Sequence, residues 1–91
     1  MPSISALVEQ LRTGIREFLL KHGLTAYQLA SLAKLDDSRV YRFVGGITKK
    51  APSPDFCEAL LSVGAKDRPF WTPEISTLLV EVRDYYRNLG I

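Results

Sequence analysis

The chain has 91 residues, 46% of them hydrophobic, with a formal net charge of +2 and a single cysteine. This length and composition predict one compact globular domain over residues 1–91, and one cysteine excludes an intramolecular disulfide. No apolar run reaches the roughly 20 residues that span a bilayer, and the N-terminus lacks the basic and apolar blocks of a signal peptide. We therefore expect a cytoplasmic protein that is not inserted in a membrane.

The first predicted element is an amphipathic helix. Apolar residues repeat at helical intervals from Ile4 to Leu19, which is the pattern of a helix with one buried face. The helix should end near His22, because Gly23 can take the left-handed conformation that closes many helices.

Two short helical patterns joined by a tight turn occupy residues 25–46. The first should begin after Thr25, because Gln28 can complete a capping box with it. The second should begin after Asp36, which can cap it, and Gly45 and Gly46 should end it. Together they predict a helix-turn-helix whose second helix, residues 37–44, packs one face inward and exposes the other. The inward positions are Leu29, Ala30, Ala33, Leu35, Val40 and Phe43.

Positive charge is concentrated on the second of these helices and on the loop after it. Between Ser38 and Lys50 there are four basic residues and no acidic ones, whereas the segment from Pro73 onward is slightly acidic. Such asymmetry suits a surface that faces phosphates. The alternative is an ordinary solvated face, which would give the same charge pattern.

Two more helices should complete the chain. Ser53, Pro54 and Asp55 are a typical helix start, and this fourth helix should run up to Gly64 with Cys57 in or near its buried stripe. A connector around residues 66–69 leads to a fifth helix over residues 73–89. Its apolar seam predicts either a dimer interface with a second copy or packing on the chain's own core. The seam residues are Ile75, Leu78, Val82, Tyr85 and Leu89.

The segment from Leu29 to Ile47 resembles the DNA-binding domain shared by lambda repressor, Cro and their many bacterial relatives. The resemblance implies an all-α, compact five-helix domain with a central helix-turn-helix. It also implies double-stranded DNA as the partner, with the start of the third helix in the major groove. Because two copies would bind a two-fold symmetric site, we expect a homodimer.

Carried over residue by residue, the resemblance places base contacts at Asp37, Ser38, Arg39 and Arg42. Arg42 is the strongest candidate, since arginine can donate two hydrogen bonds to guanine. Backbone contacts fall at Thr25, Tyr27, Lys34, Tyr41, Lys49 and Lys50, and the connector around residues 66–69 could also approach DNA. The chain departs from the family pattern in having Ala26 where many relatives have glutamine and Lys34 at a turn position that is often glycine, which implies some strain or an altered turn. It also begins the third helix with an acidic pair, Asp36 and Asp37.

Catalytic and ligand-binding motifs are missing from the sequence. No glycine-rich phosphate loop, no metal-ligand cluster and no nucleophile set beyond the lone His22 is found. We therefore expect no enzyme activity, no metal, no cofactor and no small-molecule ligand. The favoured function is a sequence-specific transcriptional regulator, a repressor of a bacterium, phage or plasmid. The alternatives are a protein interaction adaptor on a helix-turn-helix scaffold and the antitoxin of a toxin–antitoxin pair.

Overall fold

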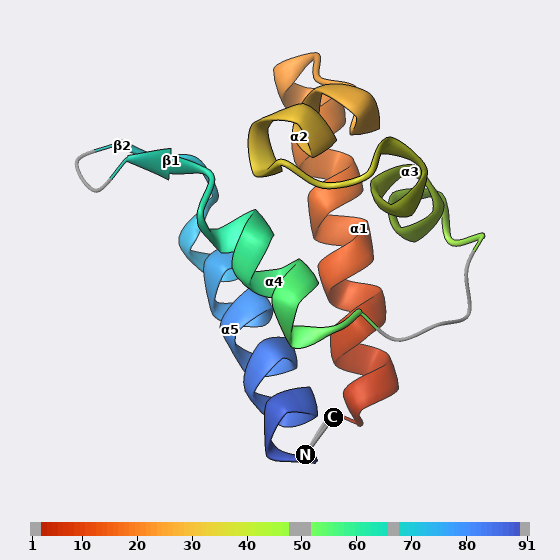
Figure 1. The fold of residues 1–91 in the computed structure, drawn as a ribbon, viewed down its shortest axis with the longest axis vertical. Helices are drawn as coiled ribbons and strands as arrows, with labels where there is room; N and C mark the ends of the chain where they lie inside the picture. The colour runs from red at the N-terminus through yellow and green to blue at the C-terminus, as the bar shows by residue number, and fades with distance from the viewer. Residues whose placement is uncertain (1–2, 48–51, 66–67, 90–91) are drawn as a thin grey trace.

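Five helices follow one another along the computed structural model, which describes residues 3–47, 52–65 and 68–89 (Figure 1). They are α1 (Ile4–His22), α2 (Ala26–Ala33), α3 (Asp37–Gly45), α4 (Pro54–Leu61) and α5 (Pro73–Asn88). The predicted all-α class is confirmed. An element that the sequence did not predict is a short antiparallel strand pair, β1 (Gly64–Ala65) and β2 (Arg68–Pro69), with Gly64 opposite Pro69.

Each of these helices begins at a polar side chain that accepts a hydrogen bond from a backbone N–H of the first turn. The predicted capping box is confirmed: Gln28 N–H donates to Thr25 Oγ1 at 3.1 Å, and Thr25 N–H donates to Gln28 Oε1 at 2.8 Å. The predicted end of α4 at Gly64 is wrong, because the helix stops at Leu61 and Gly64, with φ of 100°, begins β1. The capping residues are Ser3, Thr25, Asp36, Ser53 and Thr72.

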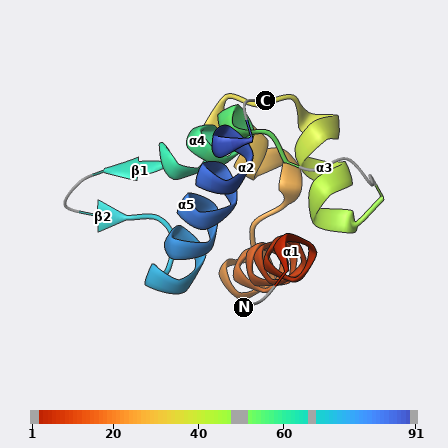
Figure 2. The same cartoon turned by 90° about the horizontal axis from the view of Figure 1, so that it is seen from below.

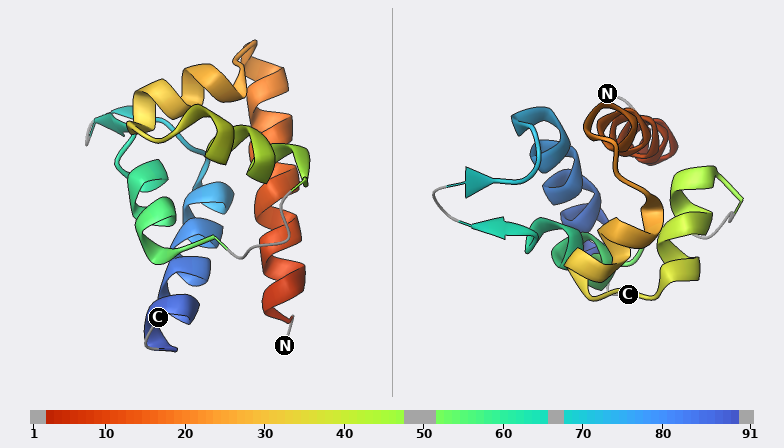
Figure 3. Two further views of the ribbon diagram at one scale, coloured as in Figure 1. Left: turned by 45° about the vertical axis from the view of Figure 1, so that its right-hand side comes forward. Right: turned by 90° about the horizontal axis from the view of Figure 1, so that it is seen from above.

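The long helix α1 is the element on which the others are arranged. It packs against both α3 and α5, while α2 packs on α3 and α4 packs on α5. The start of α1 and the end of α5 lie at the same end of the molecule (Figures 1 and 3). The strand pair projects on the side opposite to α3 (Figures 1 and 2). Thus α3 lies at one edge of the molecule with part of its surface free of other helices.

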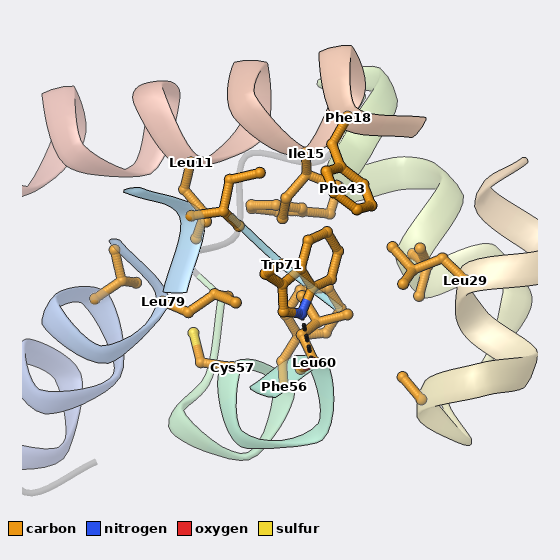
Figure 4. Packing of buried hydrophobic residues seen from close by; sticks show 14 of the residues in the cluster. Leu11, Ile15, Phe18, Leu29, Phe43, Phe56, Cys57, Leu60, Trp71 and Leu79 are labelled. Atoms are coloured by element: carbon orange, nitrogen blue, oxygen red, sulfur yellow. Dashed lines mark hydrogen bonds between the residues drawn. The ribbon is translucent and has the colours of Figure 1, made fainter. Parts of the chain in front are cut away.

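One hydrophobic cluster joins the helix-turn-helix to the rest of the chain (Figure 4). The rings of Phe43 on α3 and Phe56 on α4 lie 5.3 Å apart between centroids. Trp71, before α5, packs on Phe18 of α1 at 5.0 Å and donates its indole N–H to the Leu60 carbonyl at 2.7 Å. Because these rings link α1, α3, α4 and the start of α5, α3 has a fixed base.

Cys57 is fully buried in this cluster, as predicted, and we expect it to be unreactive in the folded protein. Burial raises the pKa of its thiol to about 11, and the thiolate is the form that reacts with disulfide reagents. In mildly alkaline buffer, labelling of Cys57 should be slow and should accelerate with urea in step with the fluorescence change of Trp71. Rapid stoichiometric labelling in native buffer would contradict this expectation.

Candidate nucleic-acid interface

The turn between α2 and α3 is made by Lys34 and Leu35. Lys34 has φ 58° and ψ 41°, and within the described ranges no other non-glycine residue has a positive φ. The left-handed conformation costs a residue with a side chain about 1–2 kcal/mol. The Leu35 N–H donates to the Ala30 carbonyl at 2.9 Å, which closes the end of α2. The turn is therefore sharp. Of the two outcomes expected for a lysine here, the structure shows backbone strain at Lys34.

The outward face of α3 is polar. Val40 and Phe43 are buried beneath the helix, whereas Asp37, Ser38 and Arg42 are exposed. An exposed polar face on a helix whose other face is anchored in the core is the arrangement that can enter a groove of DNA.

Asp36 caps the start of α3. Its Oδ1 accepts hydrogen bonds from the Ser38 hydroxyl and, at 2.9 Å, from the Ser38 N–H. These two bonds, then the Arg39 N–H and the positive charge of Arg42, hold the pKa of Asp36 below its usual value of 3.8. The carboxylate is therefore ionised at neutral pH, and the Ser38 hydroxyl is already engaged with it.

Arg39, a predicted base contact, is turned toward α4. Its Nη2 donates to Ser53 Oγ at 2.6 Å, and its guanidinium carbon lies 4.9 Å from the centroid of the Phe56 ring. This cation–π contact and hydrogen bond tie the first turn of α3 to the cap of α4. Arg39 is thus held as a support between helices although it remains exposed, and Arg42 is the other exposed arginine of α3.

Two tyrosines bridge the exposed sides of α2 and α3. The rings of Tyr27 and Tyr41 are stacked, with centroids 5.9 Å apart and planes 13° from parallel. Both side chains are about half exposed, so their hydroxyls lie where solvent or a ligand can reach them. Of the other predicted backbone contacts, Thr25 and Lys34 are exposed, while Lys49 and Lys50 lie outside the described residues.

Two arginines of α1 that the sequence analysis missed bind the other end of α3. Arg12 Nε donates to the Phe43 carbonyl at 2.7 Å, and Arg16 donates to the Val44 carbonyl from Nη2 at 2.7 Å and from Nε at 3.1 Å. A signal was present in the sequence: Arg12 falls between the apolar positions Leu11 and Ile15, where a cation needs a partner. The partner itself could not be read from the sequence.

The predicted seam of α5 is divided between the core and the surface. Ile75 and Val82 are buried in the chain's own core, so their assignment to a dimer interface is corrected: a second copy cannot reach them. Leu78 is partly buried, whereas Tyr85 is 43% exposed and Leu89 is 55% exposed. Of the predicted connector, residues 68–69 form β2, which lies on the side opposite to α3 (Figure 2), and residues 66–67 lie outside the described residues, so its approach to DNA stays a prediction.

Among the described residues, no three His, Cys, Asp or Glu side chains lie together where they could hold a metal ion. In the same ranges, no helix combines the length and apolarity needed to cross a membrane. No family model, curated protein or solved structure matches the chain. The resemblance to the lambda repressor and Cro family therefore depends on the sequence pattern from Leu29 to Ile47.

Proposed function

We propose that this chain is a sequence-specific regulator of transcription that places α3 in the major groove of double-stranded DNA. The observation that carries the proposal is the division of α3 into a buried face, Val40 and Phe43, and an exposed polar face that includes Ser38 and Arg42. An α-helix fits the width of the major groove, where each base pair presents its own pattern of donors and acceptors.

The exposed side chains have distinct roles in this proposal. Arg42 donates two hydrogen bonds to a guanine, and Asp37 accepts one from a cytosine amine. Tyr27, Tyr41 and Lys34 contact phosphates, which fix the position of the protein without specifying sequence. Thr25, Lys49 and Lys50 join this group as the sequence predicted. The role of Arg39 changes from reading a base to supporting α3.

A homodimer completes the proposal. The helix α3 has nine residues, so one copy reads only a few base pairs, and useful specificity needs two copies on a two-fold site about one helical turn apart. The surface that we assign to this contact is the part of the α5 seam that is not fully buried, formed by the partly buried Leu78 and the exposed Tyr85 and Leu89. A dimer on its operator would repress by occupying the promoter.

We expect Tyr85→Glu to give a folded monomer that binds its operator weakly. Tyr85 is exposed on α5, so the charge disturbs a contact between copies and leaves the core intact. Thr77→Glu, which adds the same charge at another exposed site of α5, is the matched control and should remain dimeric. Sedimentation equilibrium measures the mass of each variant. A monomeric wild-type protein, or an unchanged mass for Tyr85→Glu, would refute this interface.

Selection of bound fragments from random duplex DNA tests the function itself. We expect a two-fold symmetric motif, and a salt titration on the selected duplex should show affinity falling steeply as counterions compete for the phosphates. Recovery of no sequence above background would overturn the proposal.

A protein interaction adaptor is the second candidate. The observation that favours it is the exposure of Tyr27, Leu32 and Tyr41 on α2 and α3, since aromatic and apolar side chains are common in protein interfaces. Replacing Arg42, Lys49 and Lys50 together, with Arg39 kept as the support of α3, separates the two functions. If the variant loses regulation but still binds its protein partner, the DNA-binding function is supported. If regulation is retained, the adaptor function is supported.

A further inference from the structure

The C-terminal end of α3 is held by guanidinium groups from another helix. Arg12 and Arg16 lie one turn apart on α1, and they bind the consecutive carbonyls of Phe43 and Val44. The last carbonyls of a helix have no partner within the helix and carry a partial negative charge. Two guanidinium groups one turn apart on α1 therefore bind two adjacent carbonyls of α3. These bonds connect α1 to a defined point on α3.

These bonds constrain α3 in a way that apolar packing does not. Val40 and Phe43 bury the underside of α3, but hydrophobic contact is non-directional and tolerates small rotations of a helix. A hydrogen bond weakens steeply away from its preferred angle, and the guanidinium is a rigid, planar donor. Both arginines also lie beside Gly46, where a Cβ atom would be in ordinary van der Waals contact with Arg12 Cδ at 3.7 Å and Arg16 Nη2 at 3.9 Å.

The two arginines differ in burial, and this separates their roles. Arg12 is buried beside the Phe43 ring and makes an ion pair with Glu9. Arg16 is exposed, and hydrogen bonds in water contribute little net stability. Its loss should leave the protein folded while removing two of the directed bonds on α3.

We propose that Arg16 is a positioning residue for DNA recognition: its bonds to the Val44 carbonyl set the orientation at which the outward face of α3 meets the duplex. This inference depends on the proposed function. It assigns to a residue of α1, outside the helix-turn-helix, a part in sequence discrimination. Arg16 acts through α3 and is not required to touch DNA.

The test compares Arg16→Ala with Arg87→Ala. Both changes remove one positive charge from an exposed arginine that links two helices, but Arg87 pairs with Glu58, between α5 and α4, away from α3. We expect Arg16→Ala to lower affinity for the selected operator by about tenfold, because misalignment weakens base contacts that are each worth about 1–3 kcal/mol. Affinity for a scrambled duplex should be nearly unchanged. Arg87→Ala should match the wild-type protein on both.

Two further measurements exclude other roles for Arg16. The slope of affinity against salt should be that of wild type, since a lost phosphate contact would reduce it by about one. Arg16→Lys, which can keep one bond to the Val44 carbonyl, should recover part of the operator affinity. The thermal midpoint of each variant shows that the protein is folded where binding is measured.

The results that would overturn the inference are distinct from those that would overturn DNA binding. Equal losses on operator and scrambled DNA with a reduced salt slope would make Arg16 a phosphate contact. Unchanged operator affinity would show that the core alone orients α3. In both cases the proposed function stands. If the wild-type protein selects no sequence, the proposed function fails and the role of Arg16 fails with it.

Discussion

Replacement of Arg42 by alanine is expected to lower affinity for the selected operator by about 10- to 100-fold, since a bidentate arginine–guanine pair is worth about 1–3 kcal/mol. Arg42 lies exposed on the outward face of α3, between the buried positions Val40 and Phe43. Its side chain is absent from the core. The variant should therefore unfold at nearly the wild-type urea concentration, so that the change in binding reports recognition alone.

The matched control is Arg39→Ala, three residues earlier on the same helix. Arg39 is bonded to Ser53 and stacked on Phe56, so its loss should lower stability as well as affinity. Fluorescence anisotropy with labelled duplexes measures binding, and urea unfolding followed by Trp71 fluorescence measures stability. Arg42→Ala should thus change affinity alone, whereas Arg39→Ala should change both affinity and stability, although each variant loses the same charge.

A repeated selection with Arg42→Ala makes the expectation sharper. The selected motif should keep its symmetry and lose its preference at one guanine of each half-site. If Arg42→Ala binds as tightly as wild type, or if Arg39→Ala alone relaxes the motif, the assignment of the base contact to Arg42 is wrong.

The helix starts could be predicted because capping is a local interaction. Thr25 and Gln28 are three residues apart, and the oxygen of Asp36 needs only the N–H of Ser38. The residue that caps the start of each helix is therefore adjacent in the sequence to the helix that it caps. Strain at Lys34 could be expected from the sequence for the same reason, because the cost of a positive φ falls on that residue alone.

The supports of α3 could not be predicted because they join distant parts of the chain. Arg39 and Ser53 are separated by 14 positions, and Arg12 and Phe43 by 31. A helical pattern shows which side chains share a face, but it does not show what covers that face. For the same reason the α5 seam was apolar as predicted, while the division between the buried Val82 and the exposed Tyr85 depended on where α1 and α4 pack.

The largest loss of stability from a charged residue is expected at Arg12. The side chain is 8% exposed, donates to the Phe43 carbonyl at 2.7 Å and lies 5.1 Å from the centroid of the Phe43 ring. A hydrogen bond from a charged group contributes about 1.5–3 kcal/mol, and the buried stem adds packing. Arg12→Ala should therefore lower the free energy of unfolding by about 2–4 kcal/mol, a large part of the roughly 5–15 kcal/mol of a small domain.

Arg12→Met separates the two contributions, because methionine keeps most of the apolar stem and loses the donors. The Phe43 carbonyl still accepts from the Gly46 N–H in that variant, so no acceptor is left without a partner and the cost should be smaller than for alanine. Arg16→Ala is the exposed counterpart and should change stability by less than about 1 kcal/mol. Urea unfolding followed by Trp71 fluorescence measures all three. Equal stability of Arg12→Met and wild type would mean that only the stem of Arg12 matters. In that case the hydrogen bond to Phe43 would not hold α3, and the directed contact between α1 and α3 would depend on Arg16 alone.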